Sequence, residues 1–134
     1  MDVARATSAL DGSRFARIGW VDETGSTNAD LVALARAGGP EQVLGADHQT
    51  AGRGRLGRTW TAPRGASILM SVLVRPSTHT DPHLVTTALG LAAAEAVEEV
   101  AGRRLGIKWP NDLVAGATDA PDDRKVAGVL AESA

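Results

Sequence analysis

The chain has no cysteine among its 134 residues, which excludes a disulfide framework and a thiolate zinc site. It also lacks any long apolar run, because Arg, Asp or Glu interrupts every candidate for a membrane-spanning helix. The first residues do not follow the basic, apolar and small-residue order of a signal peptide. With 43% hydrophobic and 22% charged residues, the composition fits one globular domain with a real core, which we expect to be cytoplasmic.

Lysine is scarce, and acidic residues are missing from one long segment. Lysine occurs only at Lys108 and Lys125. Between His48 and Thr80 there are five arginines and no Asp or Glu, although the whole chain carries a net charge of −2. A nucleic-acid binder usually spreads its basic charge over a face and adds lysine. The concentrated positive charge therefore favours a small anionic ligand over a polyanion.

Strand-like and helix-like patterns alternate along the chain. Apolar runs bounded by turn residues predict strands, and apolar residues at helical spacing predict helices. The expected strands cover 14–22, 42–48, 66–75, 104–109 and 125–132, and the expected helices cover 28–37 and 82–101. This alternation, with a hairpin near the end, predicts an α+β fold in which a mixed β-sheet is flanked by helices.

Local signals add detail to these elements. Thr27 and Asp30 resemble a capping box at the start of the first helix. The nearly unbroken apolar run of 66–75 is typical of a strand that is covered on both faces. Apolar residues at helical spacing on the second helix predict packing against a sheet, namely Leu84, Leu91, Ala94 and Val97.

The segment 49–60 combines three glycines, three arginines and a tryptophan. Glycine lets the backbone approach a ligand closely, and Arg53, Arg55 and Arg58 are permanently charged forks that suit phosphate or carboxylate. Because nothing in the neighbouring sequence neutralises these arginines, we predict an anion-binding loop that becomes ordered when it binds. The alternative is a flexible surface loop whose arginines are solvated.

The same segment contains a G-x-G-x-x-G pattern, which is also found in dinucleotide-binding folds. That fingerprint needs a helix after the glycines and an acid about 20 residues further on. Residues 58–65 contain Trp, Pro and Gly and lead to another strand, and the next acid after Asp47 is Asp81. We therefore set the dinucleotide interpretation aside.

A polar cluster at 23–28 is a second candidate site. Ser26, Thr27 and Asn28 would together suit a small uncharged polar group such as a urea or an amide. The alternative is that Thr27 only caps the following helix, which leaves Ser26 and Asn28 unexplained.

The segment around Pro110 is a third candidate site. Pro110 would rigidify the turn after a strand, so that Asn111 and Asp112 present oxygen ligands as a magnesium–nucleotide site needs. Alternatively, both side chains only bond to the backbone of a hairpin corner. Lys125 is either a solvated strand residue or a group that points into a site beside Gly128.

From about Phe15 onward, the chain resembles the catalytic domain of the biotin protein ligases. Four motifs carry the resemblance in that family's order, and together they are very specific: GSTN at 25–28, QTAGRGRLGRTW at 49–60, KWPNDL at 108–113 and KVAGVLAE at 125–132. The resemblance implies a fold related to class II aminoacyl-tRNA synthetases and shared with biotin–lipoyl ligases.

The resemblance also implies an activity and a set of site residues. Biotin and ATP, with Mg²⁺, would give biotinyl-5′-AMP and pyrophosphate, and the adenylate would then acylate a lysine of a biotin carboxyl carrier protein. The implied biotin-binding residues are Ser26, Thr27, Asn28, Gln49, Gly52, Arg53 and Gly128. The implied nucleotide-binding residues are Arg55, Arg58, Trp60 and Asn111. The implied catalytic residues are Lys125, Arg55, Arg58 and Asp112, with Asp112 also expected to hold Mg²⁺.

The chain departs from the family pattern in three places. Too few residues precede Arg14 for a DNA-binding winged helix, and the loop at 116–124 is longer and more acidic than expected. The chain also stops before the family's later nucleotide segment and small C-terminal β-domain. We therefore expect residues 1–134 to be the N-terminal portion of the catalytic domain, to bind neither DNA nor membrane, and to have weak or no ligase activity alone.

Three alternative functions remain open at this point. A lipoate-type ligase shares the fold and the adenylation chemistry. A non-catalytic biotin-binding or interaction module would have arisen by loss of the C-terminal part. Binding of nucleic acid through the arginines predicts a steep salt dependence, and only the segment 49–60 supports it.

Overall fold

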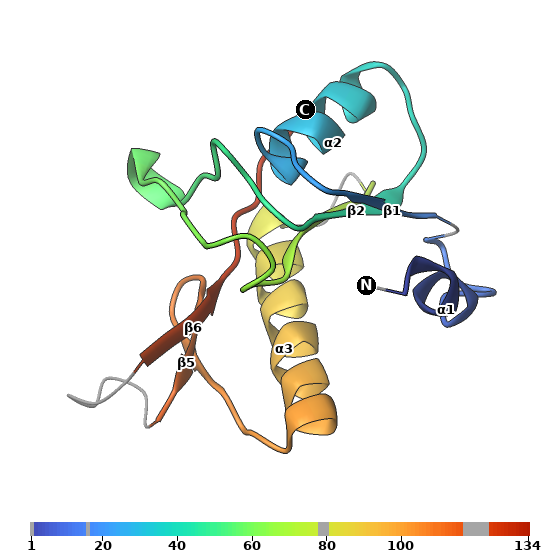
Figure 1. Cartoon of the computed structure of the whole chain (residues 1–134). Helices are drawn as coiled ribbons and strands as arrows, with labels where there is room; N and C mark the ends of the chain where they lie inside the picture. Colours follow the sequence, from blue (N-terminus) through green and yellow to red (C-terminus); the bar gives the residue numbers. More distant parts are fainter. Residues whose placement is uncertain (1, 16, 78–80, 117–123) are drawn as a thin grey trace. The chain divides into compact units, whose positions relative to one another are not determined.

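The computed structural model describes residues 2–15, 17–77, 81–116 and 124–134, and these form two compact units. The first unit comprises 1–76 and 132–134, and the second comprises 77–131. The first contains α1 (Val3–Ser8), β1 (Ile18–Val21), α2 (Thr27–Arg36), β2 (Gln42–Ala46), the 3₁₀ turn η1 (Arg55–Gly57) and β3 (Leu69–Leu73) (Figure 1). The second contains α3 (Pro82–Ala101), β4 (Gly106–Lys108), β5 (Asp112–Ala115) and β6 (Arg124–Gly128).

A mixed three-stranded sheet organises the first unit. Its order is β1-β2-β3, with β1 parallel and β3 antiparallel to β2. Trp20 and Gly45 pair across β1 and β2, and a Cβ atom at Gly45 would lie only 2.2 Å from the Trp20 ring. The ring is also fixed by a 2.9 Å hydrogen bond from its Nε1 to Asp47. Glycine at position 45 therefore makes room for the tryptophan that covers the sheet.

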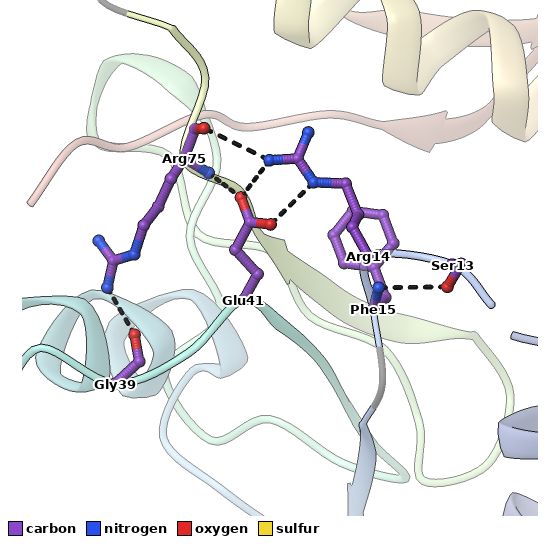
Figure 2. Close-up of polar contacts among 6 residues, drawn as sticks. All are labelled: Ser13, Arg14, Phe15, Gly39, Glu41 and Arg75. Atoms are coloured by element: carbon purple, nitrogen blue, oxygen red, sulfur yellow. Dashed lines mark hydrogen bonds and ion pairs between the residues drawn. The ribbon is translucent and has the colours of Figure 1, made fainter. Parts of the chain in front are cut away.

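Glu41 joins the three strands of this sheet at one end. Because β1 and β2 are parallel and β3 is antiparallel, the starts of β1 and β2 meet the end of β3 there. The Glu41 carboxylate accepts hydrogen bonds from Arg14 Nε at 2.8 Å and Nη2 at 2.6 Å, and from the backbone N–H of Arg75 (Figure 2). Hydrogen bonding to Arg14, followed by that to Arg75, lowers the pKa of Glu41.

Helix α2 packs on β2 and β3 and begins one residue earlier than expected. Its N-cap is Ser26, whose hydroxyl accepts a hydrogen bond from Ala29 N at 3.4 Å. The prediction that Thr27 and Asp30 form a capping box is therefore wrong, because Thr27 is already the first helical residue. The Asp30 carboxylate instead accepts a 2.6 Å hydrogen bond from the Thr24 hydroxyl.

The second unit contains an antiparallel sheet in the order β4-β5-β6, with α3 against β4 and β5. The sequence did not predict strand β5, because the strand is only four residues long and three of them are apolar. Leu113 and Val114 in β5 keep 2% and 1% exposure, so both faces of the central strand are covered. The α+β class with helices flanking a mixed sheet is confirmed, although the strands form two separate sheets.

Helix α3 has the expected ends but not the expected buried face. Asp81 caps it by accepting a 2.9 Å hydrogen bond from His83 N, and Gly102 ends it with φ +62°. Ala94 and Val97 are partly buried, whereas Leu84 and Leu91 are exposed, so only part of the predicted apolar stripe is covered. Strand β3 also differs from expectation, since Met70 keeps 49% exposure and one face is left partly open.

In the part of the chain that the structure describes, no helix combines the length and apolar character needed to cross a membrane. A cytoplasmic location stays a prediction. Residues 117–123 of the acidic loop expected at 116–124 lie outside the described residues.

Candidate functional site

The start of α2 carries a buried polar cluster within the first unit. Ser26 and Thr27 keep only 5% and 2% exposure. Gln49, which follows β2, accepts hydrogen bonds at its Oε1 from Thr27 N at 2.8 Å and from Thr27 Oγ1 at 3.0 Å. The Ser71 hydroxyl in β3 lies 2.8 Å from Thr27 Oγ1. Two segments that are distant in sequence thus meet Thr27 at the start of α2.

The protons of this cluster can be assigned from the bonds themselves. The Thr27 N–H can only donate, so the Gln49 atom that it meets must be the carbonyl oxygen. Thr27 then gives its single hydroxyl proton to the same oxygen and must accept from Ser71. The Ser71 oxygen therefore keeps lone pairs that can accept a further hydrogen bond. The Gln49 amide nitrogen, a donor, faces Gly52. A donor and an acceptor on neighbouring side chains match an amide or a urea.

Ser71 was not among the predicted site residues. The signal that could have found it is a single hydroxyl within the apolar run LMSVL of β3. A serine at this position contributes no apolar area, and a buried hydroxyl is unfavourable unless it is hydrogen-bonded, so its presence indicates a polar partner. The partner, Thr27, is known only once β3 is aligned with β2 and with the start of α2.

Residues 49–60, called here the Arg-Gly loop, form a short hydrogen-bonded hairpin. Trp60 N donates to Gly52 O at 2.9 Å, and Gly54 N donates to Arg58 O at 2.7 Å. The tip is η1, where Leu56 and Gly57 take positive φ values of 57° and 73°. Figure 1 shows this tip in green, extended away from α2. Ordering of the loop by an anion concerns its motion and stays a prediction.

Gly52 is required where the two limbs of the hairpin approach each other. A Cβ atom there would lie 2.4 Å from the Trp60 carbonyl oxygen and 3.2 Å from Gln49 Nε2. The limbs enclose an open cavity of about 410 Å³. It is lined by Thr50, Ala51, Gly52, Arg53, Gly54, Gly57, Arg58 and Thr59. Close backbone contact and two arginines around one cavity are what an anion-binding loop needs.

The five arginines between His48 and Thr80 divide into two groups. Arg64 pairs with Glu23 at 2.6 Å and donates to Asp22 O at 2.8 Å, so it fixes the chain after β1. Arg75 belongs to the contacts around Glu41. The three arginines of the Arg-Gly loop are exposed at its surface, with Arg55 at the start of η1. Their role in binding an anion stays a prediction.

The expectation that nothing offsets the charge of these arginines is wrong in one respect. Glu132 Oε1 lies 3.0 Å from Arg53 Nη1, and Glu132 Oε2 accepts a 2.6 Å hydrogen bond from Asn28 Nδ2. The counter-ion comes from a part of the chain far from the loop in sequence. Neighbouring residues alone could not reveal it.

A second cluster lies in the second unit, where strand pairing places Asp112 between Lys108 and Gly128. Lys125 Nζ lies 2.7 Å from Asp112 Oδ1. A Cβ atom at Gly128 would lie 3.2 Å from Lys125 Nζ, so the glycine leaves space for the lysine chain. Asn111 is held by a 3.1 Å hydrogen bond from its Nδ2 to Val129 O. Asn111, Asp112, Lys125 and Gly128 therefore lie close together, and their role in binding a ligand stays a prediction.

A β-bulge explains why Lys125 and Gly128 can share a face. Side chains alternate along a strand, so residues three apart normally point to opposite faces. Leu113 pairs with Ala127, whereas the next residue, Val114, pairs with Lys125, which leaves Val126 as an extra residue. The extra residue reverses the alternation and turns Lys125 towards Asp112. The spacing in the sequence alone would have predicted the opposite.

The donor set of the second cluster fits a magnesium ion that arrives with a nucleotide. Among the described residues, no group of three or more His, Asp or Glu side chains gathers that could hold a metal ion. Mg²⁺ usually binds one or two carboxylates together with substrate phosphates and water. Asp112 can supply one such carboxylate, with Lys125 already on its Oδ1.

Comparison with solved structures defines the class of protein to which this fold belongs. The biotin protein ligase from Aquifex aeolicus, solved with biotin and ATP, matches 88% of this chain and 47% of its own, with a TM-score of 0.72 and 34% identity. The Leishmania major biotin protein ligase, solved with biotin, matches 87% of this chain and 51% of its own, with a TM-score of 0.71 and 32% identity. The fold is that of the biotin protein ligases.

The chain belongs to the biotin/lipoate A/B protein ligase family, whose model matches residues 27–134. A biotin–[acetyl-CoA-carboxylase] ligase from Mycobacterium tuberculosis is 42% identical over 92% of this chain and 47% of its own length. The bifunctional ligase/repressor BirA of Escherichia coli is 33% identical over 92% of this chain and 36% of its own length. The chain therefore spans about half or less of the curated relatives it matches.

Proposed function

We propose that this chain takes part in activating biotin to biotinyl-5′-AMP and in transferring biotin to a lysine of a biotin carboxyl carrier protein. The observation that carries the proposal is the buried Thr27–Gln49–Ser71 cluster next to an arginine-lined cavity. One part suits an uncharged urea and the other an anion, and biotinyl-5′-AMP has both groups in one molecule. The name of the Mycobacterium relative supports the same activity.

The biotin end would be held by the first cluster. Gln49 would donate from its amide nitrogen to the ureido oxygen, and Ser71 would accept from a ureido N–H. Ser26 and Thr27 would act through the hydroxyl groups and backbone at the start of α2. Gly52, Arg53, Asn28 and Gly128 complete the proposed biotin-binding residues.

Adenylation brings two anions together, because a biotin carboxylate oxygen attacks the α-phosphorus of ATP and pyrophosphate leaves. The protein mainly has to supply position and positive charge. Arg55, Arg58 and Lys125 would supply the charge. Trp60 would pack near the adenine, and Asn111 would contact the nucleotide, while Asp112 would orient Lys125 and hold the Mg²⁺ that shields the phosphates.

Transfer needs no nucleophile from this chain. The lysine amine of the carrier protein attacks the acyl carbon of the mixed anhydride, an amide forms and AMP leaves. The arginines of the Arg-Gly loop would retain the adenylate until that lysine arrives.

Calorimetry tests the proposed ligand. We expect the chain to bind biotin and, more tightly, a non-hydrolysable biotinyl-5′-AMP mimic, and to bind lipoate more weakly than biotin. Preference for lipoate would make this a lipoate-type ligase instead. Binding of neither biotin nor the mimic would refute the proposed site.

A second candidate function is binding without transfer. In that case biotin and the mimic bind, but no carrier protein is labelled. We expect weak or no labelling of a carrier domain by residues 1–134. Robust labelling would show that this expectation is wrong.

A further inference from the structure

Glu132 connects two parts of the first unit that carry the proposed site. It lies in 129–134, after β6 and outside any helix or strand. Its side chain is 27% exposed, with one oxygen 3.0 Å from Arg53 Nη1. Its other oxygen accepts a 2.6 Å hydrogen bond from Asn28 Nδ2. One carboxylate therefore bridges the start of α2 and the Arg-Gly loop.

Each partner of Glu132 is next in sequence to a residue of the site. Asn28 follows Thr27, whose N–H and hydroxyl both bind Gln49. Arg53 follows Gly52 at the base of the hairpin and lines the 410 Å³ cavity. Fixing these two side chains fixes the direction of the guanidinium relative to the residues proposed to hold biotin.

Orientation is a better account of this contact than stability. The Arg53 and Glu132 side chains are 48% and 27% exposed, so water screens their attraction and the pair contributes little to folding. A long arginine side chain has many rotamers, however, and a ligand that needs one of them must otherwise restrict it on binding. A bound carboxylate removes that cost before the ligand arrives.

We propose that Glu132 is a positioning residue that holds Arg53 and Asn28 ready for the acyl-adenylate. This inference rests on the proposed function, because the ligand that benefits is the one proposed above. Glu132 acts through Arg53, so its effect on binding should disappear when Arg53 is removed.

A double-mutant cycle tests the proposal in the full 134-residue chain. Glu132→Gln keeps the size of the side chain and an acceptor for Asn28 but removes the charge that faces Arg53. It should weaken binding of the biotinyl-5′-AMP mimic about ten-fold, which corresponds to about 1.4 kcal/mol. Adding Glu132→Gln to Arg53→Ala should change binding little further, and Glu132→Asp should recover part of the loss.

The matched control is Glu98→Gln on α3. It also removes one carboxylate that is paired with an arginine, at 2.9 Å from Arg104, but it lies in the second unit. This variant should bind the mimic as the unchanged chain does. All variants should keep the same thermal midpoint, which separates orientation from loss of folding.

Limited trypsin digestion provides a measurement that needs no ligand. Cleavage after Arg53 should become about three-fold faster in Glu132→Gln, because this substitution removes the ion pair that holds Arg53. Cleavage after Arg53 should stay unchanged in Glu98→Gln, whose partner is Arg104. Unchanged cleavage would show that Glu132 does not hold Arg53. Equal or tighter binding of the mimic by Glu132→Gln, or additive losses in the cycle, would also overturn the proposal. If the unchanged chain binds neither biotin nor the mimic, the proposed function fails, and the digestion still decides whether Glu132 holds the loop.

Discussion

Replacing Gly52 with alanine should open the base of the Arg-Gly loop and weaken binding of a biotinyl-5′-AMP mimic roughly 30-fold. The added Cβ would lie 2.4 Å from the Trp60 carbonyl oxygen, a backbone atom that cannot move without the opposite limb of the hairpin. It would also press on Gln49 Nε2 at 3.2 Å, the amide proposed to bind the ureido group.

The magnitude follows from two costs. Forcing an extra methyl group into a packed site typically costs about 1–3 kcal/mol. Relief by separation of the limbs sacrifices the 2.9 Å hydrogen bond from Trp60 N to Gly52 O, and such a bond contributes about 0.5–1.5 kcal/mol. Together these costs destabilise the closed hairpin that binds the mimic by about 2 kcal/mol, and a loss of this size in binding free energy corresponds to a roughly 30-fold weaker affinity.

Gly54→Ala is the matched comparison in the same loop. A Cβ at this position would lie 3.5 Å from Arg58, which is ordinary contact, and its φ of −118° suits alanine. Titration calorimetry with the mimic should show a much smaller loss for this variant than for Gly52→Ala. Equal losses for the two alanines, or none for Gly52→Ala, would refute the argument from close approach.

Three further predictions concern the loop and the sheet beneath it. Arg53→Ala should weaken retention of biotinyl-5′-AMP that is supplied preformed, so that more of it labels the lysines of a bystander protein. Mass spectrometry of the bystander measures this labelling, and unchanged labelling would contradict the role given to Arg53. Gly45→Ala should lower the free energy of unfolding by about 2 kcal/mol in a denaturant titration, because its Cβ would lie 2.2 Å from the Trp20 ring, and an unchanged midpoint would contradict that packing. The hydrogen bond from Arg14 lowers the pKa of Glu41 below its ordinary value of 4.5. The carboxylate therefore stabilises the fold at pH values above 4.5, and this stabilisation is lost as the pH falls through the lowered pKa. The difference in thermal midpoint between the unchanged chain and Glu41→Gln should therefore shrink in acid, and a constant difference would speak against the ion pair.

The sequence was most informative where structure depends on neighbouring residues. The ends of α3 at Asp81 and Gly102 were predicted correctly, because a cap is decided by a few adjacent residues. The glycines and arginines of the Arg-Gly loop were likewise recognised as a unit. Thr27 and Ser26 show the limit of local rules, since either residue could cap α2 by sequence.

By itself, therefore, the sequence determined the family, the α+β class and the residues that could bind an anion, because four short motifs and local capping signals are written in consecutive residues. Only the tertiary structure decided which side chains meet. Strand pairing brought Ser71 to Thr27, the bulge at Val126 turned Lys125 towards Asp112, and the chain after β6 carried Glu132 to Arg53. Such contacts depend on register and chain path over long separations, which no local pattern encodes.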